Sequence, residues 1–211
     1  MKYIYLHGFL SGPASRKGLF LEEQFKALGI PLERPDLNQP DFSEMTISGQ
    51  LKIIESCIAE AGQPVVLLGS SLGGYLATLA AERHKQVRRL VLMAPAFRFA
   101  ERYLKSLNEA QLREWREKGH LDIYHGGYQE NRQLKYGIVE DARQYIDFPL
   151  KRQLPVQIFH GLRDEVVPYS LSLDYLKEHP MTDLVLLHSD HGLLDKLDVM
   201  WDYISAFLNL R

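Results

Sequence analysis

The sequence predicts an α/β protein with a mostly parallel sheet covered by helices on both faces. Its 211 residues alternate between short apolar runs and segments with helical spacing. Such alternation indicates a parallel sheet, because each crossover to a parallel neighbour needs about a helix's length of chain. Ligands of such sheets bind beyond the carboxyl ends of the strands, so we expect the functional residues there.

The predicted strands are apolar runs bounded by Gly, Pro or Asp. Each run is continuous rather than alternating, which is typical of a strand buried on both faces. A sixth run is weaker than the other five. In chain order the predicted strands are residues 3–7, 31–37 (the weaker run), 65–69, 87–93, 156–160 and 184–188.

The segments between these runs have apolar residues at helical spacing. They supply the crossovers that a parallel sheet requires, and the last one follows the final strand. The predicted helices are residues 16–28, 49–61, 72–84, 169–178 and 195–210.

Residues 97–150 interrupt the alternation. Residues 100–118 and 140–146 have helical composition, residues 120–136 look irregular, and no convincing strand is visible. A long insertion after a strand, near the edge where ligands bind, is most simply a cap. We therefore expect one domain over residues 1–211 with residues 97–150 as a helical cap; a solvated helical pair is the alternative.

The composition excludes several classes of protein. The single cysteine, Cys57, rules out an internal disulfide scaffold and a thiolate zinc cluster. A net charge of −2 gives no broad positive field for nucleic acid. We expect no signal peptide and no membrane span, and hence a cytoplasmic protein. No glycine-rich phosphate loop occurs, and no cofactor is expected; the sequence does not indicate the oligomeric state.

A candidate nucleophile lies between the third strand and the helix that follows it. The stretch Gly69-Ser70-Ser71-Leu72-Gly73 has the spacing G-x-S-x-G at a strand-to-helix turn. Glycines two positions either side of a serine on such a sharp turn let the strand and the helix approach closely. This spacing selects Ser71; Ser70 is interpreted as a buried hydroxyl bonded to backbone.

The candidate base is His191. A serine hydroxyl is a weak nucleophile until an imidazole takes its proton. Of the eight histidines, His191 lies just after the last predicted strand and before the final helix, where the chain order serine, acid, histidine places the base. His160, at the end of the preceding strand, is interpreted as a packed residue.

The candidate acid is Asp164, which should hold the tautomer of the imidazole. It follows the strand at residues 156–160 and precedes a Val-Pro pair that anchors the loop to a helix. Asp190 and Asp195 are nearer to the base in sequence, but an adjacent side chain generally points elsewhere. Glu165 is interpreted as solvated.

Two backbone amides are candidate donors to the oxyanion. The N–H of Leu72 opens a helix just after the serine, and the His7-Gly8 turn after the first strand can aim the N–H of Phe9 at the same oxygen. Losing one such donor typically costs about 10²- to 10³-fold in rate.

No metal site is expected from the remaining histidines. His7 as a ligand is a weak alternative, and His120 and His125, with Asp122 between them, lack helical spacing. We interpret His120 and His125 as surface or substrate-facing residues. Cys57 lies on an apolar helix face and is interpreted as core.

Four stretches together resemble the α/β-hydrolase superfamily. The opening Tyr5-Leu6-His7-Gly8-Phe9 is similar to that of small bacterial esterases of the YqiA type. The serine turn and the ending Ser189-Asp190-His191 are also similar to those of the mitochondrial acyl-protein thioesterase that hydrolyses acyl glucuronides. The fourth stretch runs from His160 to Pro168, and the likeness covers nearly the whole chain.

The resemblance implies a serine hydrolase that cleaves small-molecule carboxylic esters or thioesters. Ser71, Asp164 and His191 would form the catalytic triad, with the amides of Phe9 and Leu72 as the oxyanion donors. The same triad would also serve a lipase, a peptidase or a perhydrolase. A binding protein on a hydrolase scaffold is a further alternative, because fold alone does not establish catalysis.

The cap is expected to contribute to substrate binding. Its aromatic residues interleave with arginines, and Phe97, Arg98 and Tyr103 are the candidate contacts. Apolar walls with a basic rim would suit an acyl chain joined to a polar or anionic leaving group. The alternative is that these aromatic residues pack the cap onto the core.

Overall fold

The computed structural model describes residues 1–146 and 148–210, so residue 147, in the expected cap, and residue 211 lie outside the description. Its main sheet has six strands in the order β2-β1-β3-β4-β7-β8, and every neighbouring pair is parallel. The strands are β1 (Lys2–Leu6), β2 (Leu32–Glu33), β3 (Val65–Ser70), β4 (Val87–Met93), β7 (Val156–Gly161) and β8 (Thr182–Leu187). The predicted α/β class with a parallel sheet is confirmed.

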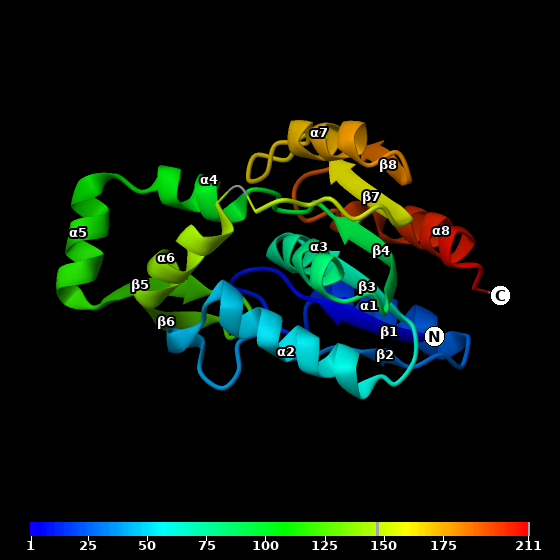
Figure 1. Cartoon of the computed structure of the whole chain (residues 1–211), viewed down its shortest axis with the longest axis horizontal. Helices are drawn as coiled ribbons and strands as arrows, with labels where there is room; N and C mark the ends of the chain where they lie inside the picture. Colours follow the sequence, from blue (N-terminus) through cyan, green and yellow to red (C-terminus); the bar gives the residue numbers. More distant parts are fainter. Residues whose placement is uncertain (147, 211) are drawn as a thin grey trace.

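Helices cover both faces of this sheet (Figure 1). One face carries α1 (Arg16–Ala27) and α8 (Leu197–Leu208). The other carries α2 (Ile47–Glu60), α3 (Leu72–Arg83) and α7 (Ser170–Glu178). Short 3₁₀ helices at Phe42–Glu44 and Leu194–Lys196 lie in the loops.

Strand β3 shows why the apolar runs are continuous. Val65 and Leu67 pack in the cluster under α2 and α3. Val66 and Leu68 pack in the cluster under α1 and α8. Because successive side chains point to opposite faces, a strand buried on both faces needs an apolar residue at every position.

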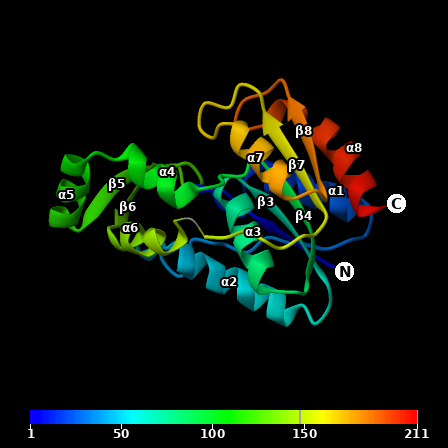
Figure 2. The same cartoon turned by 45° about the horizontal axis from the view of Figure 1, so that its top comes forward.

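The segment between β4 and β7 projects from the sheet in both cartoon views (Figures 1 and 2). It contains α4 (Phe99–Ser106), α5 (Glu109–Lys118), β5 (His120–His125), β6 (Glu130–Lys135), α6 (Gly137–Ala142) and a 3₁₀ turn at Arg143–Tyr145. We call this the β4–β7 segment. The expectation of an irregular stretch at residues 120–136 was wrong, because β5 and β6 pair there as an antiparallel hairpin.

The β4–β7 segment has an apolar cluster of its own. Trp115, Leu134 and Ile138 are buried there, together with Phe42 and Met45 from the loop before α2. The indole Nε1 of Trp115 donates to the Leu134 carbonyl at 2.8 Å, so α5 is attached to the hairpin.

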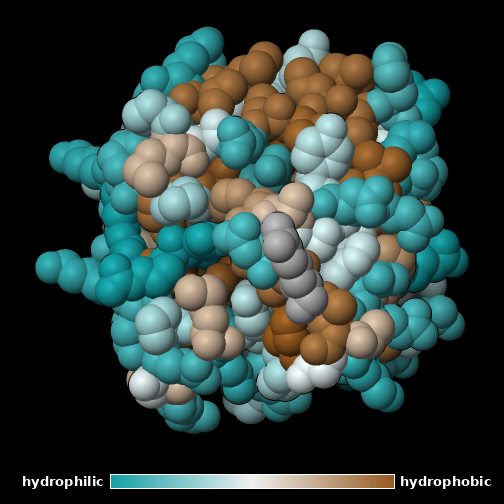
Figure 3. Space-filling model, turned by 90° about the vertical axis from the view of Figure 1, so that its right-hand side faces the viewer, coloured by the Kyte–Doolittle hydropathy of each residue, from teal (hydrophilic) through white to brown (hydrophobic). Residues whose placement is uncertain are grey.

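Both termini lie on the side of the molecule away from the β4–β7 segment (Figure 1). Figure 3 shows that this side carries several groups of hydrophobic residues among hydrophilic ones. Within residues 1–146 and 148–210, no helix is both long enough and apolar enough to cross a membrane.

Candidate active site

Ser71 lies at the turn between β3 and α3. Its backbone has φ 52° and ψ −119°, a conformation that costs free energy for a residue with a side chain. The Ser71 N–H donates to the Met93 carbonyl at 2.9 Å, which ties the turn to the end of β4. The strained backbone presents the hydroxyl beyond the carboxyl edge of the sheet.

The glycines around Ser71 are required by close backbone contacts. A Cβ on Gly69 would lie 2.4 Å from the Gly73 carbonyl oxygen. A Cβ on Gly73 would lie 2.2 Å from the Leu6 carbonyl oxygen and 2.5 Å from that of His7. Only residues without a Cβ let α3 begin this close to β1 and β3.

Ser71, His191 and Asp164 form a chain of hydrogen bonds. The distance from Ser71 Oγ to His191 Nε2 is 3.0 Å. The distance from His191 Nδ1 to Asp164 Oδ2 is 2.7 Å. These residues follow β3, β8 and β7 respectively, so the parallel sheet brings three distant loops to one edge. A base in contact with both a hydroxyl and a carboxylate is the arrangement that activates a serine.

The Asp164 carboxylate is buried and well supplied with donors. Its Oδ1 accepts the backbone N–H groups of Val166 and Val167 at 2.9 and 2.8 Å. Burial alone would raise the pKa of Asp164, but hydrogen bonds from His160, His191 and Val167 outweigh it and hold the pKa well below its ordinary value. Asp164 therefore stays ionised beside the imidazole.

His160 was interpreted as a packed residue at a strand end, but its ring also contacts the candidate acid. Its Nε2 lies 3.2 Å from Asp164 Oδ2 and 2.9 Å from the Val167 carbonyl, and its Nδ1 lies 2.8 Å from Ser172 Oγ. The fully buried ring thus contacts the same carboxylate oxygen as His191 and helps to hold it. The signal in the sequence was a histidine four residues before the acid, at a strand end.

The backbone amides of Phe9 and Leu72 are unoccupied donors. Among the residues that the structure describes, neither N–H donates a hydrogen bond to a protein acceptor. Leu72 is the first residue of α3 and has no carbonyl of that helix to reach. A Cβ on Gly8 would lie 3.2 Å from Ser71 Cβ, so the chain that carries Phe9 passes directly beside the serine.

Two cavities meet at Ser71 and His191. The first, of about 390 Å³, has mainly apolar walls, which include Phe99, Tyr103 and Val166. The second, of about 730 Å³, is bounded by residues 8–17, by the tip of the hairpin and by Gly192. The predicted contact Tyr103 therefore lies in a cavity that reaches the serine.

Lys17, which was not among the predicted site residues, faces the second cavity. Its Nζ donates to the Gly192 carbonyl at 2.7 Å, which ties α1 to the loop that carries His191. Burial lowers the pKa of Lys17 to about 8, and attraction to Asp190 and Asp164 opposes that shift. Nothing in the local sequence marks this lysine, because its partner is distant in the chain.

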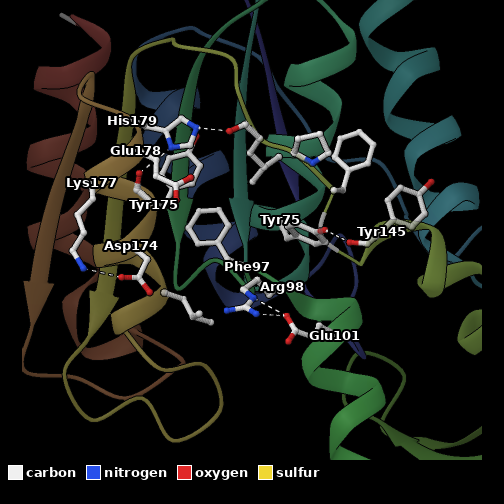
Figure 4. A pocket seen from close by; sticks show the side chains of 14 residues that line it. Tyr75, Phe97, Arg98, Glu101, Tyr145, Asp174, Tyr175, Lys177, Glu178 and His179 are labelled. Atoms are coloured by element: carbon white, nitrogen blue, oxygen red, sulfur yellow. Dashed lines mark hydrogen bonds and ion pairs between the residues drawn. The ribbon is translucent and has the colours of Figure 1, made fainter.

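Phe97 and Arg98 line a different cavity, of about 470 Å³, whose described walls do not include Ser71 or His191 (Figure 4). Phe97 stacks on Tyr175 with ring centroids 4.6 Å apart, and Arg98 pairs with Glu101 at 2.5 Å. The cavities that reach the serine do not include these two residues among their described walls, and the expected contact of Phe97 and Arg98 with substrate stays a prediction. A helix-spaced aromatic pattern does not say which side of the segment faces the site.

The competing acids do not contact His191 in the structure. Asp190 Oδ1 accepts the backbone N–H groups of Gly192 and Leu193, and Asp195 accepts the Ser189 hydroxyl. Both carboxylates therefore stabilise the turn that presents the histidine. Ser70 is buried at the end of β3.

No group of three or more potential metal ligands occurs among the described residues. His7 Nε2 accepts the Leu37 N–H at 3.0 Å. His120 Nε2 lies 4.0 Å from Asp122 Oδ2. His125 was expected to be at the surface or to face substrate. It is fully buried in the hairpin, where its Nδ1 accepts the Tyr128 N–H at 3.1 Å.

A parallel sheet covered on both faces, with this site at its carboxyl edge, defines an α/β hydrolase. Residues 2–209 match the model of the Uncharacterised protein family (UPF0227). The chain belongs to that family.

Relatives with similar sequences are named as thioesterases. The palmitoyl-protein thioesterase ABHD10, mitochondrial, of Rattus norvegicus is 27% identical over 209 residues, which cover 93% of this chain and 70% of the relative. The Homo sapiens protein of that name is 28% identical over 212 residues, which cover 93% and 68%.

Solved structures agree with this relationship. The alpha/beta hydrolase domain-containing protein 10 from mouse has a TM-score of 0.82 and 25% identity, with 99% of this chain and 89% of that chain covered. A putative hydrolase from Agrobacterium vitis S4 has a TM-score of 0.85 and 26% identity, with 98% and 87% covered.

Proposed function

We propose that this chain is a serine hydrolase that cleaves carboxylic esters or thioesters of small molecules through an acyl-enzyme on Ser71. The observation that carries the proposal is the hydrogen-bond chain from Ser71 Oγ through His191 to Asp164, at 3.0 and 2.7 Å. The thioesterase activity in the name of the ABHD10 relatives supports the choice of bond.

The first half of the reaction forms the acyl-enzyme. His191 Nε2 takes the Ser71 proton as Oγ attacks the acyl carbonyl, and the carbonyl oxygen becomes an oxyanion. The N–H groups of Phe9 and Leu72 donate to that oxygen. Imidazolium then gives its proton to the leaving alcohol or thiol as the bond to the acyl carbon breaks. Asp164 stabilises the imidazolium throughout this half.

The second half returns the free enzyme. A water molecule loses a proton to His191 Nε2 and attacks the acyl carbon. The second oxyanion uses the same two amides. Collapse of that intermediate releases the carboxylic acid, and the proton on His191 returns to Ser71 Oγ.

The two cavities suggest how the substrate lies. The apolar cavity beside Phe99 and Tyr103 suits the acyl chain, and the larger cavity beside Lys17 suits a polar leaving group. We further propose that the β4–β7 segment acts as the cap of the single hydrolase domain, because Phe99 and Tyr103 both belong to α4.

The test of the nucleophile uses neighbouring serines. A fluorophosphonate probe should label the wild type and the Ser70→Ala variant, because Ser70 does not contact His191. The Ser71→Ala variant should not be labelled and should lose at least about 10³-fold in ester turnover. Labelling of Ser71→Ala at the wild-type rate would contradict the proposal. Circular dichroism of the three proteins controls for folding.

The acyl-chain proposal predicts a dependence on chain length. Each methylene buried in the apolar cavity contributes about 0.8 kcal/mol, or about a fourfold increase in kcat/KM. Acetyl, butyryl and hexanoyl esters of one alcohol should therefore show rising kcat/KM. Equal values for the three esters would place the acyl chain outside this cavity.

A further inference from the structure

The loop that carries Phe9 holds a strained residue. Residues 8–12 connect β1 to the chain before α1, and Leu10 in this loop has φ 57°. A non-glycine residue keeps such a backbone only where its surroundings impose it. The direction of the Phe9 N–H depends on the path of this short loop, because that N–H belongs to the Gly8–Phe9 peptide at its start and Leu10 follows directly.

The tip of the β5–β6 hairpin is one of the neighbours that restrain the backbone at Leu10. The Gly127 N–H donates to the Leu10 carbonyl at 3.1 Å. A Cβ on Gly127 would lie 3.0 Å from the Ser11 carbonyl carbon and 3.1 Å from the Gly12 nitrogen. The two backbones are therefore in contact, and a Cβ on Gly127 would fit only if the loop or the tip shifted.

The other side of the same loop is held from the chain after β2. The Asn38 side chain is buried, and its Nδ2 donates to the Ser11 carbonyl at 2.8 Å. Leu10 and Ser11 are thus bonded by two separate elements, Gly127 on the hairpin and Asn38 on the loop.

The hairpin tip is itself fixed in place. The fully buried His125 ring accepts the Tyr128 N–H and stacks on the Tyr128 ring, with centroids 4.2 Å apart. The same ring packs edge-on against Phe42, with centroids 4.6 Å apart. Gly127 is therefore presented to the loop by a rigid turn.

We propose that the hairpin tip is part of the oxyanion-binding structure and that Gly127 is its positioning residue. Gly127 holds the Leu10 carbonyl, which belongs to the Leu10–Ser11 peptide, and so restrains the backbone just after Phe9. This restraint keeps the Phe9 N–H aimed at the developing oxyanion. This inference rests on the proposed function of Phe9. It gives the β4–β7 segment a part in the reaction besides lining the substrate cavities.

The experiment compares Gly127→Ala with a matched control, Gly137→Ala. A Cβ on Gly137, in the same segment, meets no atom within 4 Å. Gly127→Ala should lower kcat for an activated ester by about 10- to 100-fold with little change in KM, because the donor serves only the transition state. The affinity for a trifluoromethyl ketone, whose serine adduct carries an oxyanion, should fall by a similar factor. Gly137→Ala should match the wild type.

Hydrogen exchange provides a readout that does not depend on turnover. Amides of residues 8–12 should exchange faster in Gly127→Ala than in the wild type, while those of β3 should not change. Asn38→Asp is the second variant, for use if Gly127→Ala does not fold. It keeps the shape of the side chain but removes the donor to the Ser11 carbonyl, and the amides of residues 8–12 should again exchange faster.

Unchanged kcat and unchanged exchange at residues 8–12 in folded Gly127→Ala would overturn the inference. A rise in KM with unchanged kcat would also overturn it, because a residue that positions an oxyanion donor acts on kcat. An inactive wild type would overturn the proposed function instead, and faster exchange at residues 8–12 would still support the contact between hairpin and loop.

Discussion

Asp164 is a single residue whose contacts affect both the stability of this protein and its chemistry. Its carboxylate lies within hydrogen-bonding distance of two imidazole rings and two backbone amides. The same contacts that fix the His191 tautomer also lower the pKa of Asp164. A group that is more acidic in the folded state makes stability depend on pH.

We expect Asp164→Asn to remove part of this pH dependence. The ionised form is favoured by folding, so its contribution is complete above the ordinary carboxylate pKa of about 4 and is lost as the pH falls below it. At pH 7 the variant should be less stable by about 1–3 kcal/mol. That difference should shrink as the pH falls from about 5 to 3. Urea unfolding at several pH values measures it.

The control for this prediction is Glu165→Gln. Glu165 is the exposed neighbour of Asp164, and its replacement removes the same charge from the same loop. Its stability difference from the wild type should stay within about 0.5 kcal/mol at every pH. A pH-independent destabilisation in Asp164→Asn would contradict the account.

At the scale of elements, the contact of α3 with β1 and β3 positions the serine. Gly73 lies on α3 where the Leu6 and His7 carbonyls approach. Alanine is normally the better helix residue by about 1 kcal/mol, so any loss in Gly73→Ala must come from this contact.

Gly73→Ala should therefore destabilise the protein by about 4 kcal/mol or more, because its Cβ would meet backbone atoms that cannot move without shifting β1. Guanidinium unfolding, or the soluble yield if the variant does not fold, measures the effect. Gly137→Ala should stay within about 0.5 kcal/mol of the wild type. Equal stability of Gly73→Ala and the wild type would mean that α3 can move away from β1.

The elements differ in how well their sequences predicted them. Strands β3 and β7 are buried along their whole length, and β4 is buried from Leu90 to Met93. These stretches are mostly apolar, which is why the sequence predicted them. Strand β6 (Glu130–Lys135) has one buried residue, Leu134, among exposed polar ones. Its formation depends on pairing with β5, which no local pattern reveals.

In the molecule as a whole, the buried apolar residues that the structure describes form three clusters. The sheet is covered by clusters on its two faces, whereas the β4–β7 segment packs around a third cluster that contains Trp115. Phe9 and Leu10 join that third cluster from the loop after β1. Packing of the segment is thus coupled to the loop beside Ser71.

We expect Trp115→Ala to disorder the β4–β7 segment before the sheet. The substitution removes a buried indole and its hydrogen bond to Leu134, a loss of about 3–5 kcal/mol in local stability. Hydrogen exchange should rise in residues 99–145 and little in β3 and β4. Trp115→Phe, which keeps most of the apolar volume, should show a smaller rise. Uniform loss of protection in both parts would contradict this division.

Local residue patterns were enough to predict the parallel sheet, the order of its helices and the candidates Ser71, His191 and Asp164. They were enough because burial on both faces and a glycine-flanked turn each require particular residues at neighbouring positions. The contact of His160 with the acid, the cavity that Phe97 and Arg98 face, and the contact of Gly127 with the Phe9 loop became visible only in the folded chain. Those relations join residues far apart in the chain, and their geometry arises only when the elements pack.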